Sequence, residues 1–254
     1  MTVAQLDANY IRLMTDLRSR VVGLMERQFL SLPNYWQVNE DAFVRAAVPL
    51  IVGAQRTTAT VTVAWLRARL LEETGRSVPS SVNLAPIAKG LRGVPSTDLY
   101  RRPFVQTRYT WKEGATVTAA VAAGRLRLLA LASTDLQLAH TTAASDFIQR
   151  TDPNMVKGYR RVTTSKEPCP LCIKAADWHY YRGDLLPIHD NCHCIVVPAL
   201  VAPSRQTKVA GADGTLTDED KASLAALVER SEALGHPISG VPSYAAPTGA
   251  TAVA

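Results

Sequence analysis

Four cysteines are the most distinctive reactive residues of this 254-residue chain, and all four lie in one short stretch. Cys169 and Cys172 form a C-x2-C pair, and Cys192 and Cys194 follow shortly after His189. Two short-spaced ligand pairs separated by such a gap are typical of structural zinc sites, where four N or S ligands surround the ion at about 2.0 to 2.3 Å. The sequence therefore predicts a bound Zn²⁺ with a structural role.

Five side chains compete for the four positions of such a site. We expect Cys169, Cys172 and His189 to bind together with one of Cys192 or Cys194, and a four-cysteine site is the close alternative. Cys192 and Cys194 stand two residues apart, so on a strand they would face the same side. The choice between them stays open at the level of sequence.

Other uses of the cysteines fit less well. The chain shows no secretory signal, so we expect a reducing cytosol, where clustered cysteines serve metal or redox chemistry more often than disulfides. A thioredoxin-like C-x2-C would open a helix within a βαβ unit, and no such unit is visible in the pattern. The chain contains no H-x-E, H-E-x-x-H or G-x-S-x-G motif, so no catalytic residue is assigned.

The N-terminal part of the chain must position this cluster, and its apolar periodicity is helical. Apolar residues recur at three- and four-residue steps over residues 4–32. A second run starts after Asn39, a predicted N-cap, and extends towards Gly75. Pro49 lies inside this run and is expected to kink or divide it.

Residues 76–110 are rich in Gly and Pro and are expected to form an irregular connection. Arg101, Arg102 and Arg108 lie there among Tyr100, Phe104 and Tyr109. Such a pattern can contact phosphates or bases, but we expect the aromatic rings to pack and the arginines to be solvated. An Ala- and Leu-rich helix is predicted over residues 115–148. His140 lies on this helix and receives no functional role.

The pattern becomes strand-like after residue 151, and the chain as a whole is predicted to be α+β. We expect a mainly helical domain over residues 1–150 and a small zinc-stapled, β-rich domain over residues 151–200. Residues 201–254 are predicted to hold a linker, one amphipathic helix starting at Thr217, and a flexible, disordered tail rich in Pro, Ser, Ala and Gly.

Charge is distributed unevenly along the chain. The formal net charge is +6, but residues 201–254 hold four basic and six acidic residues, so residues 1–200 carry +8. A basic body is compatible with a phosphate-rich partner such as nucleic acid. With 47% hydrophobic and 20% charged residues, collagen-like and wholly disordered classes are excluded, and no apolar run is long enough to predict a membrane span.

A family resemblance rests on Cys169-Pro-Leu-Cys172, residues 181–186, Pro187-Ile-His189-Asp-Asn-Cys192-His-Cys194 and Val196-Val-Pro198. This segment resembles the C-terminal motif of the phage Mu F-like minor head proteins, in which a C-x2-C is followed by a hairpin, a His-Pro-x-Cys-x-Cys segment and a short strand. Asp190 stands where that family usually has Pro and leaves every candidate ligand in place. The helical region, with Arg101-Arg-Pro103, is similar to versions from actinobacterial phages.

The resemblance implies a minor capsid protein that acts in head morphogenesis. Such a protein would be a virion component inside the capsid, made in the host cytoplasm and associated with the portal protein, with capsid and scaffold proteins, and non-specifically with packaged DNA. Neither a membrane nor a small-molecule substrate is expected. Relatives are often labelled capsid maturation proteases, so a protease acting during head assembly is the alternative.

Overall fold

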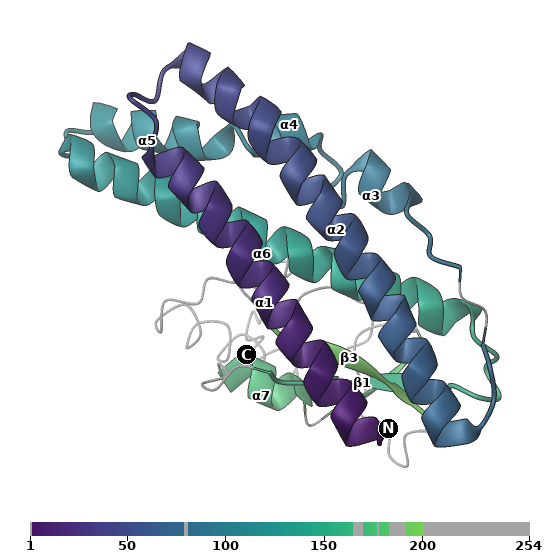
Figure 1. The fold of residues 1–254 in the computed structure, drawn as a ribbon. Coiled ribbons are helices and arrows are strands. Elements are labelled where there is room, and N and C mark those ends of the chain that lie inside the picture. The colour runs from purple at the N-terminus through teal and green to yellow at the C-terminus, as the bar shows by residue number, and fades with distance from the viewer. Residues whose placement is uncertain (1, 79–80, 165–169, 177, 183–191, 201–254) are drawn as a thin grey trace, which may run out of the picture.

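The computed structural model of the chain describes residues 2–78, 81–164, 170–176, 178–182 and 192–200. Within these residues the protein is mostly helical and carries one small three-stranded sheet (Figure 1). Its elements are α1 (Val3–Leu30), α2 (Gln37–Thr74), α3 (Ala85–Lys89), α4 (Ser96–Leu99), α5 (Arg102–Lys112), α6 (Val117–Arg150), β1 (Gly158–Val162), α7 (Pro170–Ala176), β2 (His179–Tyr181) and β3 (Ile195–Ala199).

The long helices α1, α2 and α6 form the body of the molecule, and α5 packs along the first part of α6. The sheet and α7 lie at one end of this bundle, whereas α5 lies at the other (Figure 1). Helix α1 begins with a reciprocal capping box, in which Gln5 N donates to Thr2 Oγ1 and Thr2 N donates to Gln5 Oε1. We call the end that carries α5 the distal end.

Helix α2 is continuous, so of the two effects expected from Pro49, a kink or a division, the division was wrong. A proline inside a helix removes one N–H bond, which here leaves the carbonyl four residues earlier without its partner. Pro49 is exposed, so water can reach that carbonyl. The predicted end is confirmed, because Gly75 closes the helix with a φ of 67°, which glycine adopts at no steric cost.

The predicted N-cap of α2 was also wrong. The helix begins at Gln37 with Trp36 at the N-cap, so Asn39 lies within the first turn. Its side chain instead bridges back across the preceding turn, since Asn39 Nδ2 donates to Asn34 Oδ1 at 2.7 Å. Asn39 thus fixes the loop between α1 and α2 rather than capping the helix.

Residues 76–110 are more ordered than expected, because α3, α4 and most of α5 fall within them. Pro103 stands near the first position of α5, where its missing N–H costs nothing. The contact of α5 with α6 is very close at Gly124, where a Cβ atom would lie 2.7 Å from Pro103 O and against Thr107 Oγ1. Only glycine permits this approach.

The sheet has the order β2-β1-β3, and both pairings are antiparallel. Gly158 faces Tyr181 on one side and Ala199 on the other, and Arg161 faces Val196. The strand-like pattern predicted after residue 151 is confirmed by β1, β2 and β3. Because β1 and β2 are antiparallel, α7 between them does not form a βαβ unit.

The sheet shares its hydrophobic core with the helices. One buried cluster joins Tyr10 of α1 and Phe147 of α6 to Tyr159, Tyr180 and Val196 of the three strands. A side chain also joins the sheet to α6. The Arg182 guanidinium, just after β2, donates to main-chain carbonyls at the end of α6, including Ile148 O at 2.6 Å. The predicted boundary near residue 150 coincides with the end of α6, and the core continues across it. The predictions for residues 201–254 lie outside the described residues.

Helix α6 is long and apolar enough to cross a membrane by length and composition alone, a property that the sequence inspection did not detect. Core helices of helical bundles meet the same criterion. In this structure α6 packs against α1, α2 and α5, and its buried polar groups include some that are hydrogen-bonded within the bundle and others that bond to the β3 segment. Asp135, for example, accepts from the Arg92 guanidinium and from the Tyr100 hydroxyl.

Candidate metal centre

Three of the five predicted ligands come together in the structure. Cys172 lies on α7, and Cys192 and Cys194 lie in the segment that leads into β3. All three are buried, and their Sγ atoms lie within 4.8 Å of one another. Cys169 and His189 lie outside the described residues.

The sulfur spacing suits a metal ion better than a disulfide. Cys172 Sγ and Cys192 Sγ are 4.0 Å apart, whereas a disulfide requires about 2.0 Å. Two thiolates bound to one tetrahedral Zn²⁺ at about 2.3 Å would be about 3.8 Å apart. The three described cysteines are free thiols. The arrangement can therefore hold a metal ion with three soft ligands and little rearrangement.

The electrostatics of the cluster favour negative charge on sulfur. The pKa of the Cys192 thiol lies well below its ordinary value, because Cys172 and Cys194 hydrogen-bond to its thiolate and Arg161 adds a nearby positive charge. The pKa of Cys172 is raised, chiefly because its thiol donates to Cys192. Without a cation the cluster stabilises one thiolate, and the negative charge of that thiolate disfavours ionisation of a second thiol. A bound divalent ion would stabilise further thiolates.

Strand pairing brings Arg161 to the same sheet face as the cysteines. Arg161 faces Val196 across β1 and β3, and Cys194 stands two residues before Val196, so alternation directs all three to one face. The Arg161 side chain is buried, and its guanidinium lies over the Tyr180 ring at 5.7 Å from the centroid. It is a second positive charge near the thiols, alongside Arg18 of α1.

Helix α6 holds the segment that carries Cys192 and Cys194. Gln137 Nε2 donates to Cys194 O at 2.7 Å, and the Arg18 guanidinium donates to Gln137 Oε1 at 2.9 Å. On the other side of the cluster, the Tyr180 hydroxyl donates to Ala175 O and ties α7 to β2. The three cysteines are therefore positioned by contacts with α1, α6 and the sheet.

His140, which received no role from the sequence, connects α6 to β3. Its Nε2 accepts from the main-chain N–H of Val196 at 3.1 Å, so Nε2 carries no proton. Nδ1 must then carry the proton of the neutral ring, and it donates to the Tyr10 hydroxyl at 2.7 Å. That hydroxyl donates to Thr62 Oγ1, and Thr62 donates to Thr58 O. Each donor in this series of hydrogen bonds, from His140 to Thr58 O, has an acceptor.

The neutral state of His140 is strongly favoured. Burial lowers its pKa from 6.5 to about 3, and the positive charges of Arg18 and Arg161 act in the same direction. The hydrogen bonds of His140 are structural, and they join α6 to β3 and to α1. Its partner Val196 lies 56 residues away in sequence, so no local pattern indicated the connection.

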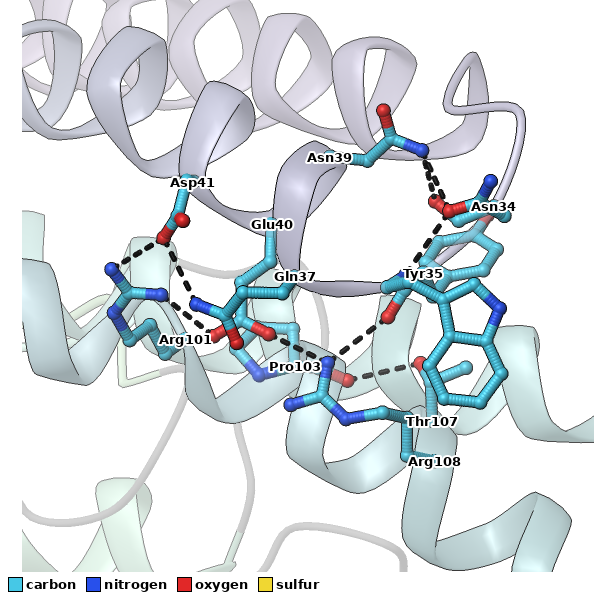
Figure 2. Close-up of polar contacts among 11 residues, drawn as sticks. Asn34, Tyr35, Gln37, Asn39, Glu40, Asp41, Arg101, Pro103, Thr107 and Arg108 are labelled. Atoms are coloured by element: carbon cyan, nitrogen blue, oxygen red, sulfur yellow. Dashed lines mark hydrogen bonds and ion pairs between the residues drawn. The ribbon is translucent and has the colours of Figure 1, made fainter.

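The expectation that Arg101 and Arg108 are solvated was wrong. Their guanidinium groups flank the buried Glu40 carboxylate, with Arg101 Nη1 at 2.9 Å from Oε1 and Arg108 Nη1 at 2.6 Å from Oε2 (Figure 2). Arg101 also pairs with Asp41, and Arg108 donates to Tyr35 O. The two arginines thus join α5 to the start of α2. Of the three aromatic residues expected to pack, Tyr100 and Phe104 are buried, whereas Tyr109 is exposed, so for Tyr109 the expectation was wrong.

Three buried thiols that can bind one metal ion are therefore the chemical centre of the described structure. Comparisons of this chain with protein-family models, with curated proteins and with solved structures find no match.

Proposed function

We propose that the chain binds one structural Zn²⁺ through Cys172, Cys192 and Cys194, with Cys169 or His189 as the fourth ligand. The observation that carries this proposal is the convergence of three buried sulfurs within 4.8 Å. The donor set fits the ion, because thiolates are soft ligands that select Zn²⁺ over hard cations. Four protein ligands leave no open position, as in structural rather than catalytic zinc sites.

The bound ion would stabilise the sheet end of the molecule. Strand β2 has three residues, and β1 and β3 have five each, so the sheet has little core of its own. An ion bound to Cys172 of α7 and to Cys192 and Cys194 before β3 would cross-link these two segments at the edge of the sheet. The Arg161 and Arg18 charges offset the excess negative charge of a zinc–thiolate centre.

We further propose that the zinc-stapled chain acts as a structural protein of a tailed-phage head, of the Mu F-like minor capsid type. What supports this is the order of the cysteine motif together with its position after a long helical body. In this proposal the chain lies inside the capsid, contacts the portal and capsid or scaffold proteins, and its basic residues contact packaged DNA without sequence preference.

The alternative, a capsid maturation protease, needs a nucleophile activated by a base. His140 is buried and has both ring nitrogens occupied by structural hydrogen bonds, so it is not available as that base. We prefer the structural role because it rests on the residues of the cysteine motif.

Metal content tests the first proposal. We expect the full chain, purified under reducing conditions, to hold about one zinc per chain, and Cys172→Ser to lose it. The matched control is Ile173→Ser, which changes an exposed neighbour on α7. Comparing Cys169→Ser with His189→Gln then identifies the fourth ligand. A reduced wild-type protein without zinc would overturn the proposal.

Association with phage particles tests the second. We expect the chain to co-purify with portal protein or with heads and to be present in the virion. A gene lying directly after a portal gene would support the same conclusion. Cleavage of scaffold or capsid protein by the purified chain, abolished by one Ser or His substitution, would instead establish the protease.

A further inference from the structure

A second site lies at the distal end of the bundle, far from the cysteines. A pocket of about 270 Å³ opens between the loop after α1, helix α5 and the start of α6. Its walls include Tyr35, Trp36, Trp111, Val117 and Val121. The Trp36 and Trp111 rings meet edge to face at a centroid distance of 6.0 Å.

The rim of this pocket is apolar and exposed. Trp36 is 54% exposed, Trp111 49% and Val117 64%. Large apolar side chains gathered around a concave site are typical of surfaces that bind another protein segment. On the adjoining α5 surface, Val105 and Tyr109 are also more than half exposed. We call the pocket and its rim the distal pocket.

The distal end is also the basic part of the molecule. Residues 20–45 and 100–127, which form it, contain nine basic and four acidic residues, a net charge of +5 out of +6 for the whole chain. Arg108, whose guanidinium pairs with Glu40, lines the pocket itself, and Lys112 follows Trp111 directly. An occupant of this site should therefore be acidic as well as apolar.

One segment of this chain has that composition. Residues 217–234 hold five acidic and two basic residues, a net charge of −3. Their apolar residues follow helical spacing and form one face, namely Leu224, Leu227, Val228 and Leu234. Acidic residues and this apolar face match the positive charge and the apolar rim of the distal pocket.

The linker is long enough to reach the pocket. Gln137 and His140 contact the start of β3, and Val121 on the pocket wall lies 19 residues before His140, which is about 28 Å along α6. Strand β3 runs away from the pocket, which adds about 13 Å up to Leu200. The 16 residues 201–216 can span about 53 Å.

We propose that residues 217–234 of this chain dock as an amphipathic helix on the distal pocket, with leucine side chains packed against Trp36 and Trp111. A protein segment is favoured over nucleic acid because the rim includes valine side chains, on which bases do not stack. Docking would cover the exposed tryptophans and place acidic residues beside Arg108 and Lys112.

Hydrogen exchange on the full chain tests the intramolecular contact. Leu224→Asp with Leu227→Asp should increase the exchange rates of the α5 amides and of residues 217–234 at least tenfold. The matched control, Ala222→Asp with Ala226→Asp, adds the same charge to the opposite helix face and should change neither. Equal exchange in wild type and the leucine variant would overturn the proposal.

A peptide titration tests the pocket directly. The probe is a fluorescein-labelled peptide of residues 217–234, and the receptor is the full chain carrying the two leucine substitutions. We expect saturable binding that weakens at least tenfold on Trp36→Ala or Trp111→Ala, and that is unchanged by Leu13→Ala, an exposed residue elsewhere on α1. Circular dichroism verifies that each variant is folded.

Three results would contradict the proposal. The first is peptide binding that is insensitive to both tryptophan substitutions. The second is a wild-type dimer that dissociates on the leucine substitutions, because the segment would then occupy the pocket of a second copy. The third is single-stranded DNA binding with the same tryptophan dependence and no binding of the peptide.

Discussion

Acidification from about pH 7.5 to about pH 5 should destabilise the fold through His140. The folded-state pKa of His140 is about 3, whereas the unfolded chain has the ordinary value of 6.5. Between these values the unfolded chain binds one proton that the folded chain does not. The stability supplied by neutral His140 is therefore fully present above pH 6.5 and is lost as the pH falls towards 3.

The magnitude follows from the size of this interval. Each pH unit below 6.5 lowers the free energy of unfolding by about 1.4 kcal/mol per proton, so the loss at pH 5 is about 2 kcal/mol. The structural reason is that a charged ring carries an N–H at Nε2, where the Val196 N–H already points. Two donors would then face each other in a buried site.

Urea unfolding of the full chain at the two pH values measures this loss. His140→Gln is the matched control, because its side-chain carbonyl can accept from Val196 N–H and it cannot become charged. Any metal release at low pH affects both proteins alike, so their difference isolates His140. If both lose the same stability between pH 7.5 and 5, the assignment of a neutral, buried His140 is wrong.

Three further predictions concern single contacts. Arg161→Gln should weaken zinc binding about tenfold in a chelator competition, because the thiolates lose a nearby positive charge. Arg160→Gln, on the exposed face of β1, should leave zinc affinity unchanged. Equal zinc affinities of the two variants would argue against a role of the Arg161 charge. Glu40→Gln should lower the free energy of unfolding by about 1 to 3 kcal/mol in urea, because two guanidinium groups lose their anion. Gly124→Ala should lower the free energy of unfolding by about 2 kcal/mol, because the added methyl group overpacks against α5. Gly53→Ala, with open space around it, should raise that free energy by up to about 1 kcal/mol. An unchanged stability of Gly124→Ala would contradict the close contact of α5 and α6.

Local patterns predicted the long helices well. The apolar periodicity over residues 4–32 and 115–148 corresponds closely to α1 and α6, and Gly75 marks the end of α2. The prediction of an irregular connection over residues 76–110 missed helix α5. Pro103 stands near the start of that helix, where proline is favoured rather than disruptive. That signal was present in the sequence.

The candidate site, like the fold, could be predicted from the sequence only in part. Cys172, Cys192 and Cys194 were among the five predicted ligands, and the structure confirms that their sulfur atoms are close together. The contacts that position them were not predictable from local patterns. Gln137 reaches Cys194 across 57 residues, and Arg108 reaches Glu40 across 68. Such pairs depend on how helices cross, which single-sequence periodicity does not specify.

The bond from Val196 to His140 has a consequence for assembly. Among the described strands β3 lies at the edge of the sheet, and an open edge can recruit a strand from another molecule. His140 accepts the outward-facing N–H of Val196, and Gln137 donates to the Cys194 carbonyl one helical turn earlier. Helix α6 thereby occupies two of the hydrogen-bonding positions that an incoming strand would need at this edge. A strand from another molecule could pair along β3 only after displacing the His140 and Gln137 side chains.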